Sequence, residues 1–235
     1  MGLEDLLSLL TTIPARGSRE GAARWFFAVP VVGLLEGLVV SVVGIALKAW
    51  PLVSATCMLV THVILTGGMH LDGTADYADV IGSRKRGKEA LMVLKDPRRG
   101  SFGVTAVVLV LLSRFSSLYY LVSHPLIIIA SYVVGMEGAY IASAIGEVEP
   151  YEGMARLIEL EARRPVNVCL NVITASLILA VILYVQPTAL LTLISLIVPV
   201  VVVADSNRRI GFVNGDVLGF VIELGEVSAL LVSVV

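Results

Sequence analysis

Charged residues and cysteines are both scarce in this sequence. Only 15% of the 235 residues are charged, whereas 57% are hydrophobic, and the mean hydropathy is +0.92. A soluble domain normally carries about 25% charged residues, so this chain has too few to cover a water-facing surface. The two cysteines, Cys57 and Cys169, lie in apolar runs, which predicts buried thiols and no disulfide or metal site. The composition therefore indicates an integral membrane protein.

The N-terminus shows no sign of a cleavable signal peptide. Its first residues, "MGLEDLLSLLTTIP", carry acids where a signal peptide carries basic residues. Residues 3–12 instead predict a short amphipathic helix at the membrane interface, with Leu6, Leu7 and Leu10 on one side. The net charge of −2 gives no indication of a nucleic-acid partner, and we expect none.

Long apolar runs make up most of the remaining sequence. A helix needs about 20 mainly apolar residues to cross the ~30 Å hydrocarbon core of a bilayer. The runs that qualify are residues 25–47, 51–67, 101–123, 125–145, 165–185, 187–204 and 217–235. We predict a single all-α domain over residues 1–235, a polytopic bundle of about seven transmembrane helices with six to eight as the range.

The basic residues predict how these helices are oriented. Fifteen of the 17 lysines and arginines fall in alternate connections of the predicted bundle, and the exceptions are Lys48 and Arg114. Because basic residues concentrate on the cytoplasmic side of membrane proteins, the N-terminus should be cytoplasmic and the C-terminus outside. The polar segments 67–100, 146–164 and 205–216 then share the cytoplasmic face.

Three aspartates follow the second predicted span, in "TGGMHLDGTADYADV" (residues 66–80). If this segment is helical, Asp72, Asp76 and Asp79 lie within a stripe roughly 60° wide. Carboxylates this close repel one another and favour a bound cation, and oxygen-only ligands suit Mg²⁺. Zinc is a poorer match, since His70 is the only imidazole nearby. His70 points away from the stripe on a helical wheel, so the helix could begin after it. The alternative for the aspartates is a solvated helix face or a helix cap.

Basic residues follow in "LKDPRRGSFG" (residues 94–103). Lys95, Arg98 and Arg99 supply cationic donors for phosphate oxygens. Gly100 and Ser101 lie where the third span should begin, and the free N–H groups of a helix start bind anions. We predict phosphate binding here, with a patch for anionic lipid headgroups as the alternative.

A third polar cluster opens the last predicted span, in "NGDVLGFVIELGEV" (residues 214–227). Carboxylates inside a membrane are costly and indicate a functional site by default. Asp216 and Glu223 are seven residues apart, so both can face the interior of the bundle. Glu226 lies within about 80° of them.

Further charges lie inside other predicted spans: Glu36, Arg114 and Glu137. A buried ion pair, such as Arg114 with Glu137, explains them as well as a ligand contact does.

An acid stripe and phosphate-binding arginines on one face favour phosphoryl or nucleotidyl transfer. Two Mg²⁺ ions ~3.5–4 Å apart could neutralise a diphosphate and stabilise the attacking and leaving oxygens. The predicted active site is built from residues 66–103 and 205–226.

The motifs resemble those of the adenosylcobinamide-GDP ribazoletransferases, also called cobalamin synthases. Residues 70–79 match the family's His-Leu-Asp-Gly-x-Ala-Asp-x-x-Asp, and "NGDVLG" resembles its C-terminal Gly-Asp-x-Leu-Gly. The chain departs from the pattern at Val80 and Leu94, and residues 136–155 lack expected arginines. The second motif, Lys-Asp-x-Arg-x-Gly-x-x-Gly, is matched by Lys95, Asp96, Arg98, Gly100 and Gly103.

The resemblance implies a step in nucleotide-loop assembly of cobalamin. A hydroxyl of α-ribazole, or of its 5′-phosphate, attacks the β-phosphorus of adenosylcobinamide-GDP, and GMP leaves. Asp72, Asp76 and Asp79 would hold Mg²⁺. Either Asp79 or Asp216 would accept the hydroxyl proton. The residues expected to stabilise or bind the substrates and their phosphates are His70, Lys95, Asp96, Arg98, Arg99, Gly100 and Asn214. The chain would lie in the cytoplasmic membrane among lipids, and a homo-oligomer stays open.

Two other functions compete with this interpretation. Enzymes that make phospholipids from CDP-alcohols also use an acidic membrane helix, with the pattern Asp-Gly-x-x-Ala-Arg. Here Gly73-Thr74-Ala75-Asp76 lacks the arginine and has a tighter spacing, which argues against that function. An ion-coupled transporter would use the intramembrane glutamates as an ion path. Against it, the acids cluster at one face and the sequence shows no inverted repeat of broken helices.

Overall fold

The computed structural model describes residues 2–234. Every regular element within these residues is helical, as predicted. In chain order the elements are α1 (Leu3–Leu10), α2 (Arg19–Trp25), η1 (Phe26–Ala28), α3 (Val29–Ala46), α4 (Pro51–Thr66), α5 (Met69–Ser83), α6 (Lys88–Leu94), α7 (Ser101–Leu121), α8 (Pro125–Ile145), α9 (Met154–Ala162), α10 (Pro165–Val185), η2 (Pro187–Leu196), α11 (Ile197–Arg209) and α12 (Gly215–Val232).

The helices confirm a multi-pass membrane protein. In the described part of the chain, five helical segments are long and apolar enough to cross a bilayer, and α4 with α5 make a sixth if this bent pair is one span. The seventh predicted span corresponds to α12, whose apolar sequence is interrupted by three carboxylates, Asp216, Glu223 and Glu226. The sixth predicted span begins as a tighter 3₁₀ helix, η2, before it continues as α11.

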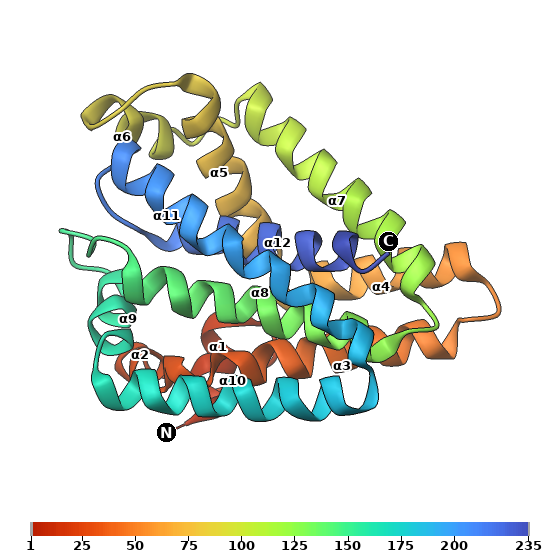
Figure 1. Ribbon diagram of the computed structural model, residues 1–235. Helices are drawn as coiled ribbons and strands as arrows, with labels where there is room; N and C mark the ends of the chain where they lie inside the picture. Colours follow the sequence, from red (N-terminus) through yellow and green to blue (C-terminus); the bar gives the residue numbers. More distant parts are fainter. Residues whose placement is uncertain (1, 235) are drawn as a thin grey trace.

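Helix α8 forms the centre of the bundle, with α3 on one side and α12 on another (Figure 1). Small residues let these helices approach closely, as expected for packing inside a membrane. A Cβ at Gly33 would meet the Tyr132 carbonyl oxygen at 2.5 Å, and one at Gly37 would meet the Ile129 Cα at 2.8 Å. The glycines of α3 therefore serve helix packing.

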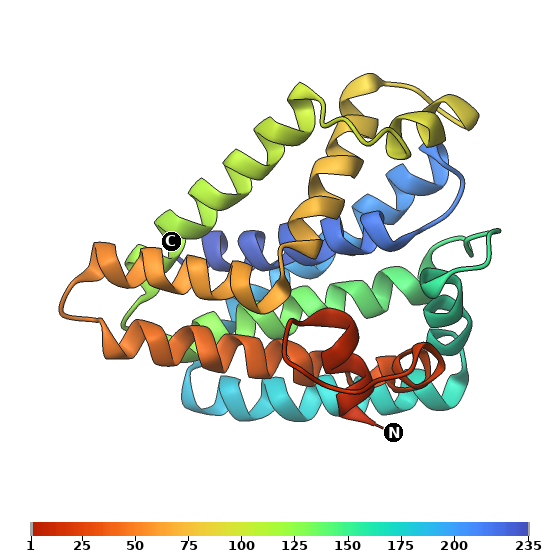
Figure 2. The same ribbon diagram turned by 180° about the vertical axis from the view of Figure 1, so that it is seen from behind.

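The polar connections gather at one end of the long helices, at the left in Figure 1. Backbone hydrogen bonds join connections that are distant in the sequence, from the Gly87 N–H to the Arg209 carbonyl (2.6 Å) and from the Val213 N–H to the Glu147 carbonyl (3.0 Å). The chain termini lie toward opposite ends of the same helices (Figure 2). The gathering of the polar connections at one end of the helices agrees with the sequence, which predicted that segments 67–100, 146–164 and 205–216 share one face.

The junction between α4 and α5 positions the site. Gly67 and Gly68 both adopt left-handed backbone conformations (φ 61° and 71°), which favour glycine because other side chains are strained there. The chain turns by 87° between the two helices. The end of α4 is held by the N-terminal segment, since the Thr12 N–H donates to the Leu65 carbonyl at 2.7 Å. As a result α5 runs across the bundle, whereas α3, α8 and α10 run along it (Figure 1).

Two smaller predictions have different outcomes. The N-terminal amphipathic helix is present as α1, with Leu6 and Leu10 buried. The prediction of two buried thiols was wrong for Cys169, which is exposed, while Cys57 is partly buried. Cys169 lies in α10, an outer helix with few buried residues, so in a bilayer an apolar residue there faces lipid and not protein.

Candidate functional site

The three aspartates of the predicted stripe lie on α5, and we call them the acid stripe. Asp72 and Asp76 share one partner, because the two terminal nitrogens of Arg99 donate to their carboxylates. Arg99 comes from the connection between α6 and α7. This arginine supplies positive charge at the place where the sequence predicted a cation.

Asp79 has a different environment from the other two aspartates. Its carboxylate oxygens accept hydrogen bonds from the Gly100 N–H (2.7 Å) and the Gly103 N–H (2.8 Å). These amides belong to the first turn of α7, whose N–H groups have no partner within the helix. Gly100 and Gly103 are needed for this approach, since a Cβ at either would collide with the Asp79 side chain. The anion at the start of α7 is therefore Asp79 itself.

Asp216 reaches the acid stripe through a close helix crossing. A Cβ at Gly73 would meet the Asp216 carbonyl oxygen at 2.8 Å, and one at Gly219 would meet the His70 Cα at 3.2 Å. Asn214 caps the start of α12, because its side-chain oxygen accepts from the Val217 N–H at 3.1 Å. Its amide nitrogen donates to Asp216 at 2.9 Å. The glycines of the "DG" and "LG" motifs thus bring two acidic helices into contact.

The basic residues of the connection are exposed and spread apart. Arg98 forms a two-pronged pair with Asp96, with contacts of 3.0 and 2.9 Å, and these hydrogen bonds lower the pKa of Asp96 to about 2. Lys95 lies 5.1 Å from the ring centroid of Tyr151, in a cation–π contact. Arg98 and Asp96 also line a cavity of about 250 Å³ together with Asp76, Asp79, Gly100 and Ser101.

The donor chemistry of this region fits Mg²⁺. Asp72, Asp76 and Asp216 offer only oxygen atoms, which is the ligand type that Mg²⁺ prefers. Asp79 is less free, because backbone amides occupy its oxygens. The guanidinium of Arg99 bridges Asp72 and Asp76, so these carboxylates already hold positive charge between them.

His70 lies inside α5, one residue after its start, and not before the helix. The possibility that the helix begins after it was therefore wrong. The side chain is buried, and neither ring nitrogen has a hydrogen-bond partner in the described part of the chain.

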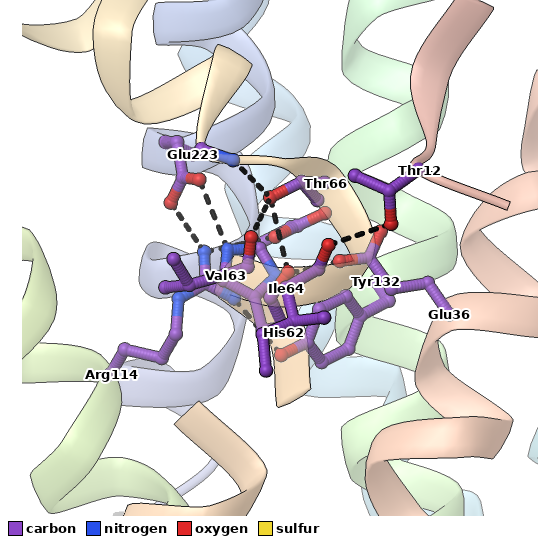
Figure 3. Close-up of polar contacts among 11 residues, drawn as sticks. Thr12, Glu36, His62, Val63, Ile64, Thr66, Arg114, Tyr132 and Glu223 are labelled. Atoms are coloured by element: carbon purple, nitrogen blue, oxygen red, sulfur yellow. Dashed lines mark hydrogen bonds and ion pairs between the residues drawn. The ribbon is translucent and has the colours of Figure 1, made fainter. Parts of the chain in front are cut away.

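A second ionic cluster lies deep among α3, α4, α7, α8 and α12 (Figure 3). His62 connects two carboxylates, with Nδ1 2.6 Å from Glu36 and Nε2 3.0 Å from Glu223. Arg114 donates to Glu223 at 2.6 Å and to Glu226 at 2.9 Å. We call this set the core network, and it consists of Glu36, His62, Arg114, Tyr132, Glu223 and Glu226.

The core network corrects one interpretation of the sequence. The suggested pair of Arg114 with Glu137 does not form, because Arg114 binds the glutamates of α12 and Glu137 accepts from Asn171 at 3.0 Å. Glu223 faces the interior, as its spacing predicted. His62 was not predicted as a member, although a histidine inside an apolar run was the available signal.

The core network could also hold a cation, since one ligand atom each from Glu36, His62 and Glu226 lie within 4.8 Å of one another. Both ring nitrogens of His62 already contact carboxylates, however. We therefore assign no metal to it.

Comparison with known proteins decides between the candidate functions. The family model described as cobalamin-5-phosphate synthase matches residues 2–234, which is nearly the whole chain. The chain belongs to this family. The resemblance seen in the three motifs is confirmed, and the phospholipid-synthesis and transporter alternatives are set aside.

Similar full-length proteins support the assignment to the cobalamin-5-phosphate synthase family. A protein of Pseudomonas fluorescens named adenosylcobinamide-GDP ribazoletransferase is 31% identical, over 98% of this chain and 96% of its own. Proteins of the same name from Chlorobium chlorochromatii and Chlorobaculum tepidum are 32% and 31% identical, over 97% and 99% of this chain and 93% and 94% of their own. No solved structure matches the chain.

Proposed function

We propose that this protein is a membrane-bound, Mg²⁺-dependent transferase that joins α-ribazole, or its 5′-phosphate, to adenosylcobinamide-GDP and releases GMP. The observation that carries the proposal is the meeting of the acid stripe with Asp216, which are residues of the family's motifs, and with Arg99, which stands at a variable position of the second motif. Such a site combines carboxylates for a cation with guanidinium groups for phosphate.

In this reaction the acceptor hydroxyl oxygen forms a bond to the β-phosphorus of the donor. The bond from that phosphorus to the oxygen of GMP breaks, and the hydroxyl proton passes to a base. Asp216 is the better candidate for the base, because both oxygens of Asp79 accept backbone N–H groups. One carboxylate oxygen of Asp216 accepts a hydrogen bond from Asn214. The other oxygen is available to orient the acceptor hydroxyl and take its proton.

The remaining residues bind and orient the phosphates. Asp72 and Asp76 would hold Mg²⁺, which supplies charge neutralisation for the diphosphate when bound. Arg99 would then contact phosphate in place of carboxylate. Arg98 and Lys95 add positive charge near the same place. Asp79, Gly100 and Gly103 fix the start of α7 and so set the position of the arginine-bearing connection.

We further propose that the site faces the cytoplasm from the cytoplasmic membrane, surrounded by lipid. The basic connections lie at the same end of the bundle as the acid stripe, which supports this orientation. Self-association is compatible with the apolar outer faces of α7 and α10, and sedimentation in detergent would test it.

The test is GMP release by purified protein in lipid vesicles, given adenosylcobinamide-GDP, α-ribazole 5′-phosphate and Mg²⁺. We expect GMP and the joined corrinoid in equal amounts, and loss of both when EDTA removes the metal. A known active enzyme of the family serves as the control. GMP release by the control but not by this protein would refute the proposal, and release that persists in EDTA would refute the metal requirement.

A further inference from the structure

An apolar cavity of about 350 Å³ lies on the side of α5 that faces α1, α9 and α12. Its apolar walls include Leu10, Phe26, Ile158 and Ile222, while Asp72 and Asp216 also line it. Cavities of this size and composition are typical of small-molecule sites. The cavity therefore places an apolar surface next to the carboxylates of the proposed reaction centre.

His70 lines the same cavity and is its most unusual residue. Only 3% of the residue is exposed, and both ring nitrogens are buried without a partner in residues 2–234. Buried polar atoms in native proteins are nearly always hydrogen-bonded. Within the described residues neither ring nitrogen is hydrogen-bonded to the core network, and the cavity that His70 lines is a space from which a ligand can supply a partner.

The cavity beside Arg98 is smaller and more polar than the cavity at His70. It is lined by Asp76 and Arg98 and by the first residues of α7, which suits phosphate groups. Asp72 lines the apolar cavity and Asp76 the polar one, and these aspartates are one helical turn apart. Molecules bound in the two cavities would therefore meet at the acid stripe.

We infer that the cavity at His70 binds the aromatic base of the nucleoside acceptor, with a ring nitrogen of His70 hydrogen-bonded to the unglycosylated nitrogen of that base. This inference rests on the proposed function. The corrin ring of the donor is too large for the cavity. Guanine fits less well than a base with fewer polar groups, because most of the cavity wall, including Leu10, Phe26, Ile158 and Ile222, is apolar. A flat base with one free ring nitrogen matches the apolar walls and the single unpaired imidazole.

Equilibrium binding of labelled α-ribazole 5′-phosphate to the full-length protein in detergent tests the inference. His70→Phe keeps a ring of similar size but removes the nitrogens, and Ala155→Leu fills the cavity from α9. Both should weaken acceptor binding about tenfold and leave donor binding unchanged. The matched control is Ala106→Leu, which adds the same atoms in an apolar cavity between α5 and α7 and should change acceptor binding less than about twofold.

An acceptor analogue separates a direct hydrogen bond from a structural effect. With CH in place of the free ring nitrogen, the analogue should bind the unaltered protein about tenfold more weakly than the natural acceptor. His70→Phe should bind both equally, and its Tm should be unchanged or higher because it removes an unpaired buried polar group.

Three results would overturn the inference. The first is unchanged acceptor binding in both His70→Phe and Ala155→Leu, and the second is that these variants weaken donor binding and not acceptor binding. The third is no acceptor binding by the unaltered protein. GMP release, measured in parallel, reports on the proposed function separately. Acceptor binding that depends on His70, without GMP release, would support the cavity assignment and refute the reaction.

Discussion

The acid stripe and the core network are built from the same kinds of side chain and differ in almost everything else. In the acid stripe, the side chains of Asp72 and Asp76 are 61% and 13% exposed, and their shared partner Arg99 is 37% exposed. In the core network, Arg114, Glu223 and His62 are fully buried. Exposed ion pairs contribute little to stability and can exchange partners, whereas a buried charge that loses its partner is strongly destabilising.

This difference indicates that the core network stabilises the fold, whereas the acid stripe is available for the proposed reaction. The core network joins α3, α4, α7, α8 and α12 and has no exposed member, so it fixes the helices that carry the site. The acid stripe can release Arg99 to solvent or to phosphate at small cost. Variants in the two places should therefore fail in opposite ways, one in folding and the other in turnover.

The largest effect is expected from Arg114→Met. This change leaves Glu223 and Glu226 buried without their cation, which should lower the free energy of unfolding by about 3–5 kcal/mol. Thermal unfolding in detergent and yield from membranes measure it. The matched control is Arg99→Met, which should retain the native Tm while losing activity. A native Tm for Arg114→Met would contradict the structural role of the core network.

Asp76→Asn should break catalysis while leaving the fold intact. Removing one carboxylate from the acid stripe weakens both cation binding and the positioning of Arg99, and we expect GMP release to fall about 100-fold or more. The free energy of unfolding should change much less than in Arg114→Met, because Arg99 is 37% exposed and keeps Asp72 as its partner. Glu89→Gln in α6 changes an exposed acid at the same end and should leave the rate unaltered. Full activity in folded Asp76→Asn protein would exclude the proposed metal role.

Gly73→Ala tests the crossing that connects the acid stripe to Asp216. The new methyl would lie 2.8 Å from the Asp216 carbonyl oxygen, so α5 and α12 must separate, at a cost of about 1–3 kcal/mol. We expect GMP release to fall about tenfold, because Asp216 moves from the acceptor.

The control for this crossing is Gly138→Ala in α8. There the added methyl would meet the Val221 side chain at 3.3 Å and no backbone, and activity should persist. Equal losses in both variants would mean that the α5–α12 crossing has no special role.

Glu159 is a buried carboxyl outside both clusters, and its replacement should have the smallest effect of the variants, a change in Tm that depends on pH. Burial raises the pKa of this α9 carboxyl from 4.5 to about 7. Between pH 4.5 and about 7, the folded state holds a proton on Glu159 that the unfolded state has lost. The free energy of unfolding therefore falls as the pH rises through this range, and it levels off above pH 7. Glu159→Gln stays neutral and should match the unaltered protein near pH 5. Near pH 8 its Tm should be higher by about 2–4 °C.

Melting curves at both pH values measure the Glu159 effect, with the exposed Glu152→Gln as the control. An identical pH profile for Glu159→Gln and the unaltered protein would show that Glu159 does not titrate with folding.

The membrane fold was predictable because its causes are local in the sequence. Apolar runs and the alternation of basic connections predicted most of the helices and the grouping of polar segments. The spacing of Asp72, Asp76 and Asp79 predicted a stripe if their segment was helical, and the segment lies in α5. The family motifs then supplied the substrate, which spacing alone does not encode.

The partners of the charged residues were not predictable, because they depend on contacts between distant segments. Arg114 had several candidate acids, and only the packing of α7 against α12 selects Glu223 and Glu226. The role of Asp79 as the anion at the start of α7 likewise requires the crossing that Gly100 and Gly103 permit. The sequence placed His70 in a family motif, but its surroundings depend on how α9 and α12 pack near α5.

The left-handed pair at Gly67 and Gly68 has a consequence for how this chain can vary. Helix α4 has 16 residues, about 24 Å at 1.5 Å per residue, which is shorter than the ~30 Å hydrocarbon core. The acid stripe, which follows α4, therefore lies nearer the middle of the bilayer than it would after a span of full length. One residue inserted into α4 would turn the glycine pair by about 100° around the helix axis and swing α5 away from α12. The length of α4 thus sets the position of the proposed site, and insertions or deletions there should be far less tolerated than in the connection after α5.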